Sequence, residues 1–272
     1  MRLKKIMKTD SYFYLFILSG LLGCIGETKT TEIDQWETQA AQVEIIRDDF
    51  GVPHIYGKTD ADAVFGLLYA QCEDDFHRVE RNYIWAIGRL AEVTGEEALY
   101  SDLRAHLFMT KNEAIDAYEA SPKWLQDLCD AFAAGINYYL YTHPEVKPEL
   151  LTHFEPWMPF YFSEGSIGGD IERVPITQIK AFYEGAQPLS LSTNDRQIQT
   201  HEYLMEPQGS NGMAIGGERT TSGNTLLLIN PHTSFFFRGE VHVVSEEGLN
   251  AYGAVTWGQF FVYQGFNEKA GW

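Results

Sequence analysis

The stretch from Gln208 to His232 reads Q-G-S-N-G-M-A-I-G-G-E-R-T-T-S-G-N-T-L-L-L-I-N-P-H. It begins with small, turn-prone residues around Ser210 and ends with an apolar run that leads into Pro231 and His232. The 22 positions that separate Ser210 from His232 are enough for a strand, a turn at residues 222–224 and a returning strand. Such a hairpin would bring the imidazole back to the neighbourhood of the serine.

A serine at this position is a candidate nucleophile if a base lies beside it. A serine hydroxyl is a weak nucleophile, and the α-amine of an N-terminal serine is one recognised base for it. A free α-amine has a pKa of about 7.7–8.0, close to the neutral range that suits a general base. Taken alone, the Gly209–Gly212 segment is typical of a surface turn, and only its spacing to His232 favours a catalytic interpretation.

Two other catalytic patterns are incomplete in this region. The nucleophile elbow of serine hydrolases requires a glycine two residues before the serine, and Gln208 occupies that place. His201 and Glu202 begin the zinc pattern H-E-x-x-H, but Met205 stands where the second histidine is required. Neither class of site is therefore expected here.

Four segments together resemble the penicillin acylase family. They are Gly209–Asn211, Thr220–His232, the G-F-N-E-K-A-G-W run at Gly265–Trp272, and R-D-D-F-G-V-P-H-I at Arg47–Ile55. The family contains penicillin acylases and acyl-homoserine-lactone acylases and belongs to the N-terminal-nucleophile hydrolases. The resemblance implies an α+β fold built on a four-layer αββα sandwich, which this chain would encode only in part, beside a mainly helical small-subunit part.

The resemblance also implies the roles of several residues. The precursor would cut itself between Gly209 and Ser210, and the freed Ser210 would act as nucleophile with its own α-amine as base. His232 would support the serine or the amine by hydrogen bonding. The sequence itself adds three adjacent aromatic residues after His232, which would either line an acyl-binding cleft or pack in the core: Phe235, Phe236 and Phe237.

The N-terminus has the features of an export signal. A basic head is followed by an apolar run too short to span a bilayer, which is typical of a secretory signal peptide. Leu21-Leu22-Gly23-Cys24 resembles the lipobox of bacterial lipoproteins, which implies lipidation of Cys24; the alternative is a plain signal peptide with an incidental cysteine. The organisation predicted for the chain is a signal peptide at 1–23, a tether at 24–42, a small subunit at 43–184, a spacer peptide at 185–209 and the start of a large subunit at 210–272.

Composition narrows the range of partners. The formal net charge of −18 makes an acidic surface that repels phosphate backbones, so nucleic-acid binding is not expected. Cys72 and Cys129 lie in apolar helical stripes, where each is expected to be a small buried hydrophobe, although an exported pair can also form a disulfide. No zinc or redox spacing of cysteines occurs.

Two long helices are expected in the small-subunit part. The first begins at Thr59, which with Asp62 forms an approximate capping box, and its apolar face continues to Leu90. The second begins with Ser121 as N-cap and Pro122 in the first turn, and ends at His143. Strands are expected at Val43–Arg47, after the turn at 48–51, and at Val241–Val244, Ala251–Thr256 and Phe260–Tyr263.

Two groups of polar residues have structural interpretations. The acids at Glu73–Asp75 point in different directions on a helix and are expected to form local ion pairs rather than a metal site. His54 is expected to be a structural histidine rather than a catalytic one.

The function predicted from these features is an exported amidohydrolase precursor that hydrolyses the amide bond of an N-acylated small molecule through an acyl-enzyme. The alternative is a non-catalytic exported lipoprotein or an inactive relative. No cofactor is expected, with a structural calcium left open. The expected partners are the small amide substrate and the remainder of the large subunit, with membrane contact only through the lipid anchor in a bacterial periplasm or outer membrane. Without that remainder, which would supply oxyanion donors, the chain is expected to be inactive and poorly soluble.

Overall fold

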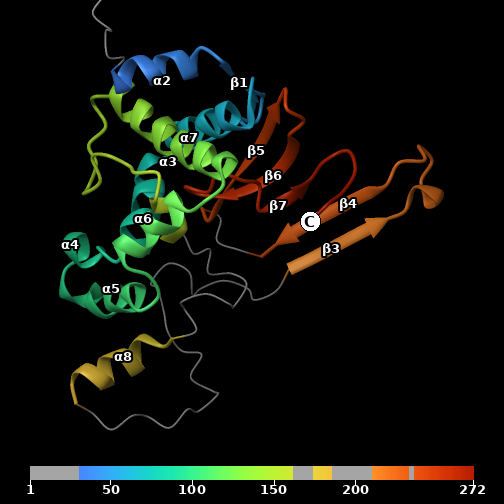
Figure 1. Cartoon of the computed structure of the whole chain (residues 1–272). Helices are drawn as coiled ribbons and strands as arrows, with labels where there is room; N and C mark the ends of the chain where they lie inside the picture. Colours follow the sequence, from blue (N-terminus) through green and yellow to red (C-terminus); the bar gives the residue numbers. More distant parts are fainter. Residues whose placement is uncertain (1–30, 162–173, 186–209, 233–235) are drawn as a thin grey trace, which may run out of the picture. The chain divides into compact units, whose positions relative to one another are not determined.

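The computed structural model describes residues 31–161, 174–185, 210–232 and 236–272 (Figure 1). The chain divides into two compact units, Met1–Gln35 and Trp36–Trp272, and only the second is described over most of its length. The predicted signal peptide, the lipidation site Cys24 and nearly all of the predicted spacer lie outside the described residues.

Helices and strands both contribute to the second unit, which makes the fold α+β. The helices are α2 (Glu32–Ala40), α3 (Asp60–Ala86), α4 (Ala91–Thr94), α5 (Leu99–His106), α6 (Lys111–Glu119), α7 (Lys123–Thr142) and α8 (Ile176–Tyr183). The strands are β1 (Val43–Arg47), β2 (Pro53–Gly57), β3 (Ser210–Ile215), β4 (Leu226–Pro231), β5 (Arg238–Ser245), β6 (Asn250–Thr256) and β7 (Gln264–Phe266). Among the described residues, no helix combines the length and the apolar character that crossing a bilayer requires.

Helix α3 begins where the sequence predicted. Thr59 is its N-cap, and the reciprocal bonds between Thr59 and Asp62 form a full capping box. The helix ends at Ala86, whereas its apolar face was expected to continue to Leu90, because Gly88 adopts a φ of +69°, the left-handed conformation that commonly terminates helices. A residue with non-helical angles, Asp75, kinks the helix midway.

Helix α7 packs against α3. Its start differs from the prediction, because Pro122 takes the N-cap position without a side-chain bond, while the Ser121 hydroxyl donates to Ala117 O at the end of α6 (2.7 Å). Its end at His143 is confirmed. The two helices approach so closely that a Cβ at Gly135 would lie 2.4 Å from Phe65 O, so glycine is required at this crossing.

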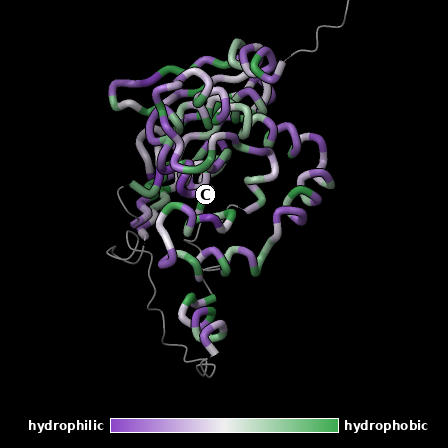
Figure 2. Tube along the Cα trace, turned by 90° about the vertical axis from the view of Figure 1, so that its left-hand side faces the viewer, coloured by the Kyte–Doolittle hydropathy of each residue, from purple (hydrophilic) through white to green (hydrophobic). Residues whose placement is uncertain are grey.

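A five-stranded sheet with the order β1-β2-β5-β6-β7 forms the other half of the core (Figure 1). The pairing of β2 with β5 is parallel, and the other three pairings are antiparallel. One face of the sheet packs against α3 through Ile55, Val241 and Val255, all at most 2% exposed. Figure 2 shows hydrophobic and hydrophilic residues alternating along the helical turns, as expected where one face of each helix meets the core.

Two predicted segments differ from the structure. Phe260–Tyr263 is not a strand, because side chains of α3 hold the preceding turn by its backbone, and the last strand of the sheet is β7 at Gln264–Phe266. The sheet nevertheless ends in two edge strands, β1 and β7, so the expectation of poor solubility stays a prediction. The region predicted as a tether contains the helix α2, and Trp36 and Ala40 of this helix pack against the core.

The cysteines lie as the sequence predicted, and the acidic residues of α3 do so in part. Cys72 and Cys129 are both free and buried, which confirms the interpretation as small hydrophobes. Of the acids at Glu73–Asp75, only Asp75 forms the expected local ion pair, with Arg78 at 2.9 Å, whereas Glu73 and Asp74 pair with Arg47 of β1. Within the described ranges, no three histidine, cysteine or acidic side chains gather closely enough to hold a metal ion.

Candidate functional site

The hairpin that carries Ser210 and His232 forms as the sequence predicted. Strands β3 and β4 pair antiparallel, with Ser210 opposite Pro231 and Asn211 opposite Asn230. The connecting turn contains Gly223 with a φ of +75°, a conformation that glycine adopts without steric cost. Because the register places the first residue of β3 beside the last residue of β4, both ends of the motif meet at one end of the hairpin.

Ser210 and His232 therefore lie at the same end of the hairpin. Ser210 is exposed at the start of β3, and His232 directly follows β4. The His232 ring is bonded through Nε2, with Asn211 Nδ2 at 3.0 Å and Asn230 Nδ2 at 3.5 Å. Among the described hydrogen bonds, none joins the His232 ring to the Ser210 hydroxyl. The other residue of the predicted cleavage site, Gly209, lies outside the described residues.

The described aromatic residues after His232 have different environments. Phe236 is 59% exposed, and the Arg78 guanidinium lies 5.4 Å from its ring centre. Phe237 is buried, and its ring lies 5.1 Å from the Arg238 guanidinium. Phe235 lies outside the described residues. Of the two that are described, Phe236 has its ring open to solvent, whereas Phe237 is packed.

His54 pairs with a second histidine that sequence reasoning missed. Its Nδ1 lies 2.9 Å from Nδ1 of His242, directly across the parallel β2–β5 pairing, and its Nε2 lies 3.6 Å from the Asp48 carboxylate. The other nitrogen of His242 contacts Asn250 Oδ1 at 3.0 Å. This arrangement ties two strands together, in agreement with a structural role for His54.

The pKa values of two groups near the histidine pair, Asp48 and Tyr252, differ from their usual values. Burial acts to raise the pKa of Asp48, but the backbone N–H groups of Phe50 and Val52 together with His54 outweigh it and hold the pKa below its usual value. Burial, and then a hydrogen bond to Glu240 Oε1 (2.7 Å), raise the pKa of Tyr252 to about 12. The outer face of the sheet at this point is thus polar and hydrogen-bonded.

Polar side chains of α3 hold the turn that follows β6. Gln71 donates from Nε2 to Gln259 O and accepts at Oε1 from the Gly258 N–H, both at 2.8 Å. Tyr83 donates its hydroxyl to Gly258 O at 2.9 Å, and Asn82 Nδ2 donates to a neighbouring carbonyl. Sequence reasoning missed these contacts, although a glutamine inside an apolar helical stripe is a signal of a buried polar role.

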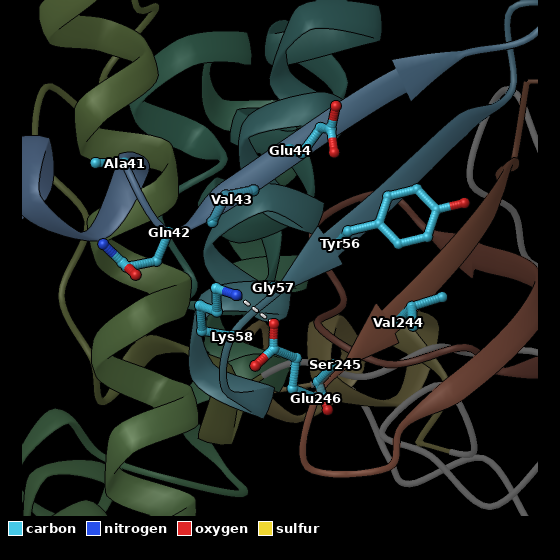
Figure 3. Close-up of a pocket in the computed structure, with 10 residues that line it drawn as sticks. All are labelled: Ala41, Gln42, Val43, Glu44, Tyr56, Gly57, Lys58, Val244, Ser245 and Glu246. Atoms are coloured by element: carbon cyan, nitrogen blue, oxygen red, sulfur yellow. Dashed lines mark hydrogen bonds and ion pairs between the residues drawn. The ribbon is translucent and has the colours of Figure 1, made fainter.

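A pocket opens where β1 begins and where β2 and β5 end (Figure 3). It is lined by residues 41–44, 56–58 and 244–246, and an ion pair joins Lys58 to Glu246 across it. None of the residues predicted as catalytic lines this pocket. Its lining comes from both sides of the predicted cleavage site, so it marks another place where the two parts of the chain meet.

Comparison with known proteins gives consistent matches. Residues 42–272 match the family model described as penicillin amidase. Acyl-homoserine lactone acylase PvdQ of Pseudomonas fluorescens (strain Pf0-1) is 25% identical over 253 residues, 84% of this chain and 32% of the relative. Penicillin acylase 2 proenzyme of Pseudomonas sp. (strain SE83) is 30% identical over 125 residues, 45% of this chain and 16% of the relative.

The chain is also similar to solved structures over part of its length. A thermostable penicillin G acylase from Alcaligenes faecalis, in tetragonal form, aligns with 58% of this chain and 97% of its own, at 18% identity and a TM-score of 0.41. The chain spans about a third of the length of the PvdQ relatives that it matches.

Proposed function

The chain belongs to the penicillin amidase family, and we propose that it is part of an amidohydrolase precursor that cleaves itself between Gly209 and Ser210. The acylases among its relatives support a hydrolase acting on amide bonds. The freed Ser210 would attack the amide carbonyl of an N-acylated small molecule. The acyl group would then be transferred to the serine and released by water.

One observation carries this proposal: the register of the hairpin brings Ser210 and His232 to the same end. Ser210 faces Pro231 across the strands, and His232 is the next residue along the chain. Ser210 is exposed and begins a strand, a position that an N-terminal nucleophile also requires. After cleavage its α-amine would serve as the base for its own hydroxyl, because the pKa of an α-amine, about 7.7–8.0, lies near neutrality.

The acyl group is proposed to lie against the aromatic residues that follow His232. Phe236 provides an exposed ring there, and the Arg78 guanidinium covers one side of it. The names of the relatives include acyl-homoserine lactone acylases and a penicillin acylase, so an acyl-lactone or a penicillin is the proposed class of substrate. The mechanism uses the serine, its amine and hydrogen-bond donors, and it involves no cofactor.

The rest of the fold and the location of the protein are also proposals. The four-layer αββα sandwich would be completed by the remainder of the large subunit, whose donors would stabilise the oxyanion. The leader would direct export to the periplasm of a bacterium, and lipidation of Cys24 would anchor the protein to the outer membrane. Replacing Cys24 with serine should release the protein from the membrane fraction, and an unmodified N-terminus elsewhere would contradict lipidation.

The proposal is tested by Ser210→Ala in the full-length protein, with Ser222→Ala as a matched control. Ser222 lies in the turn of the same hairpin, away from the proposed cleavage site. Mass spectrometry should find a fragment that begins at Ser210 in the wild type and in the control, and a single uncut chain in the Ser210 variant. Equal processing of all three proteins, or acyl release that survives the loss of Ser210, would refute the proposal.

A further inference from the structure

Two asparagine side chains reach the same ring nitrogen of His232. Asn211 and Asn230 face each other across β3 and β4, and each directs its amide nitrogen at His232 Nε2, at 3.0 Å and 3.5 Å. Within the described residues, no charged side chain forms a hydrogen bond or an ion pair with this ring. The polar surroundings of His232 are thus set by two neutral amides.

The chemistry of the amide group determines which form of the ring these contacts favour. A side-chain amide nitrogen donates and cannot accept, so His232 Nε2 must accept through its lone pair. In that arrangement the ring carries its proton on Nδ1, and Nδ1–H is the group that it can donate to a neighbour. A doubly protonated ring would place an N–H opposite an N–H and lose both contacts.

We infer that Asn211 is a positioning residue, which holds His232 in the neutral form protonated on Nδ1 and joins the ring to the chain segment that begins with Ser210. This inference rests on the proposed function. Asn211 is favoured over Asn230 because its contact is shorter and because it directly follows the nucleophile. A displacement of Ser210, the N-terminus formed by the proposed cleavage, would therefore move the imidazole through Asn211 alone. A displacement of the imidazole would move Ser210 in the same way.

The charge of residue 211 shows whether its side chain faces the His232 ring, and kcat on the same proteins shows whether that contact positions the ring for the reaction. Asn211→Asp keeps the size of the side chain but replaces a donor with a carboxylate, which attracts a proton to Nε2. Opposite charges within about 4–6 Å favour the charged form of a titrating group, so the imidazolium should persist to higher pH. Asn224→Asp, in the hairpin turn, introduces the same charge without facing His232 and is the matched control.

The experiment measures the pH dependence of His232 acylation by diethyl pyrocarbonate, which modifies only unprotonated imidazole. The full-length protein is labelled over a series of pH values, and the peptide that contains His232 is quantified by mass spectrometry. Asn211→Asp should move the midpoint upward by about one pH unit, as expected for a partly solvated charge pair. Asn211→Ala should also raise the midpoint, by less than Asn211→Asp, and should speed modification of the unprotonated ring, because Nε2 loses the nearer of its two amide partners.

Acyl release measured on the same proteins tests the consequence for the reaction. Both Asn211 variants should lower kcat by about 10- to 100-fold with little change in KM, since misplacement of a catalytic group acts mainly on the chemical step. Equal midpoints in Asn211→Asp and Asn224→Asp would overturn the inference, and so would a shifted midpoint with unchanged kcat. Failure of the proposed function is recognised separately, by turnover that does not depend on Ser210.

Discussion

Replacing Glu80 should weaken the fold more than any exposed acidic residue does. Glu80 lies on α3 with 0% exposure, and its carboxylate accepts three backbone N–H groups from one loop. Oε2 accepts from Glu149 at 2.9 Å, and Oε1 accepts from Leu150 at 2.7 Å and from Leu151 at 2.9 Å. The side chain thus fixes this loop to the helix, and Leu151 enters the core beside it.

The magnitude follows from the number of donors left without an acceptor. In Glu80→Gln the remaining oxygen can still serve Leu150 and Leu151, but the new amide nitrogen opposes the Glu149 N–H, which costs about 1–3 kcal/mol. In Glu80→Ala all three donors lose their acceptor, and at about 1 kcal/mol or more for each the loss is about 3 kcal/mol or greater. Each kcal/mol corresponds to a fall in Tm of about 2–4 °C for a protein of this size.

Urea unfolding followed by tryptophan fluorescence measures these losses. The control is Glu149→Gln, which removes the exposed pair of Glu149 with Arg81 (2.9 Å and 3.1 Å) and should cost at most about 1 kcal/mol. The order of stability should be wild type, then Glu149→Gln, then Glu80→Gln, then Glu80→Ala. If Glu80→Gln were as stable as Glu149→Gln, the three-donor argument would be wrong.

Further predictions concern buried polar and titrating groups. Gln71→Leu should lower the free energy of unfolding in urea by about 2–4 kcal/mol, because it leaves a buried N–H and a buried carbonyl without hydrogen-bond partners. A smaller loss than in Glu149→Gln would contradict this. Tyr252, whose folded pKa is raised to about 12, favours the neutral phenol, so its stabilising effect is complete below about pH 10 and is lost as pH rises through 12. Tyr252→Phe should flatten this decline in unfolding curves measured from pH 9 to 12. Burial raises the pKa of both Cys72 and Cys129, so iodoacetamide at pH 8 should modify neither until urea unfolds the protein, and rapid labelling of the native state would show that they are accessible.

Local signals in the sequence were sufficient to predict several elements. The capping box at Thr59 predicted the start of α3, and the glycine-containing turn between two apolar runs predicted the β3–β4 hairpin, whose register the structure adds. The ends of elements were harder to predict. Gly88 terminates α3 through its backbone conformation, which periodicity of apolar residues does not encode, and Pro122 displaces Ser121 as the cap of α7.

Contacts between distant segments were not predictable from local patterns. His54 and His242 are 188 positions apart, and they meet through the parallel pairing of β2 with β5. No short turn joins two parallel strands, so no local sequence signal predicts this pairing. The same holds for Gln71, whose partners follow β6. At the candidate site, the meeting of Ser210 and His232 could be predicted because one hairpin contains both, whereas the proposed role of Asn211 depends on the direction of its side chain, which the sequence does not give.

The parallel pairing of β2 with β5 affects how the protein would recover from denaturation. In the uncut chain a long segment joins the two strands, so they search for each other within one molecule. Cleavage before Ser210 would leave β2 and β5 on different polypeptides, and the sheet would then re-form only when two molecules meet, with a yield that depends on concentration. The matured protein would therefore persist through slow unfolding rather than through a reversible folding equilibrium.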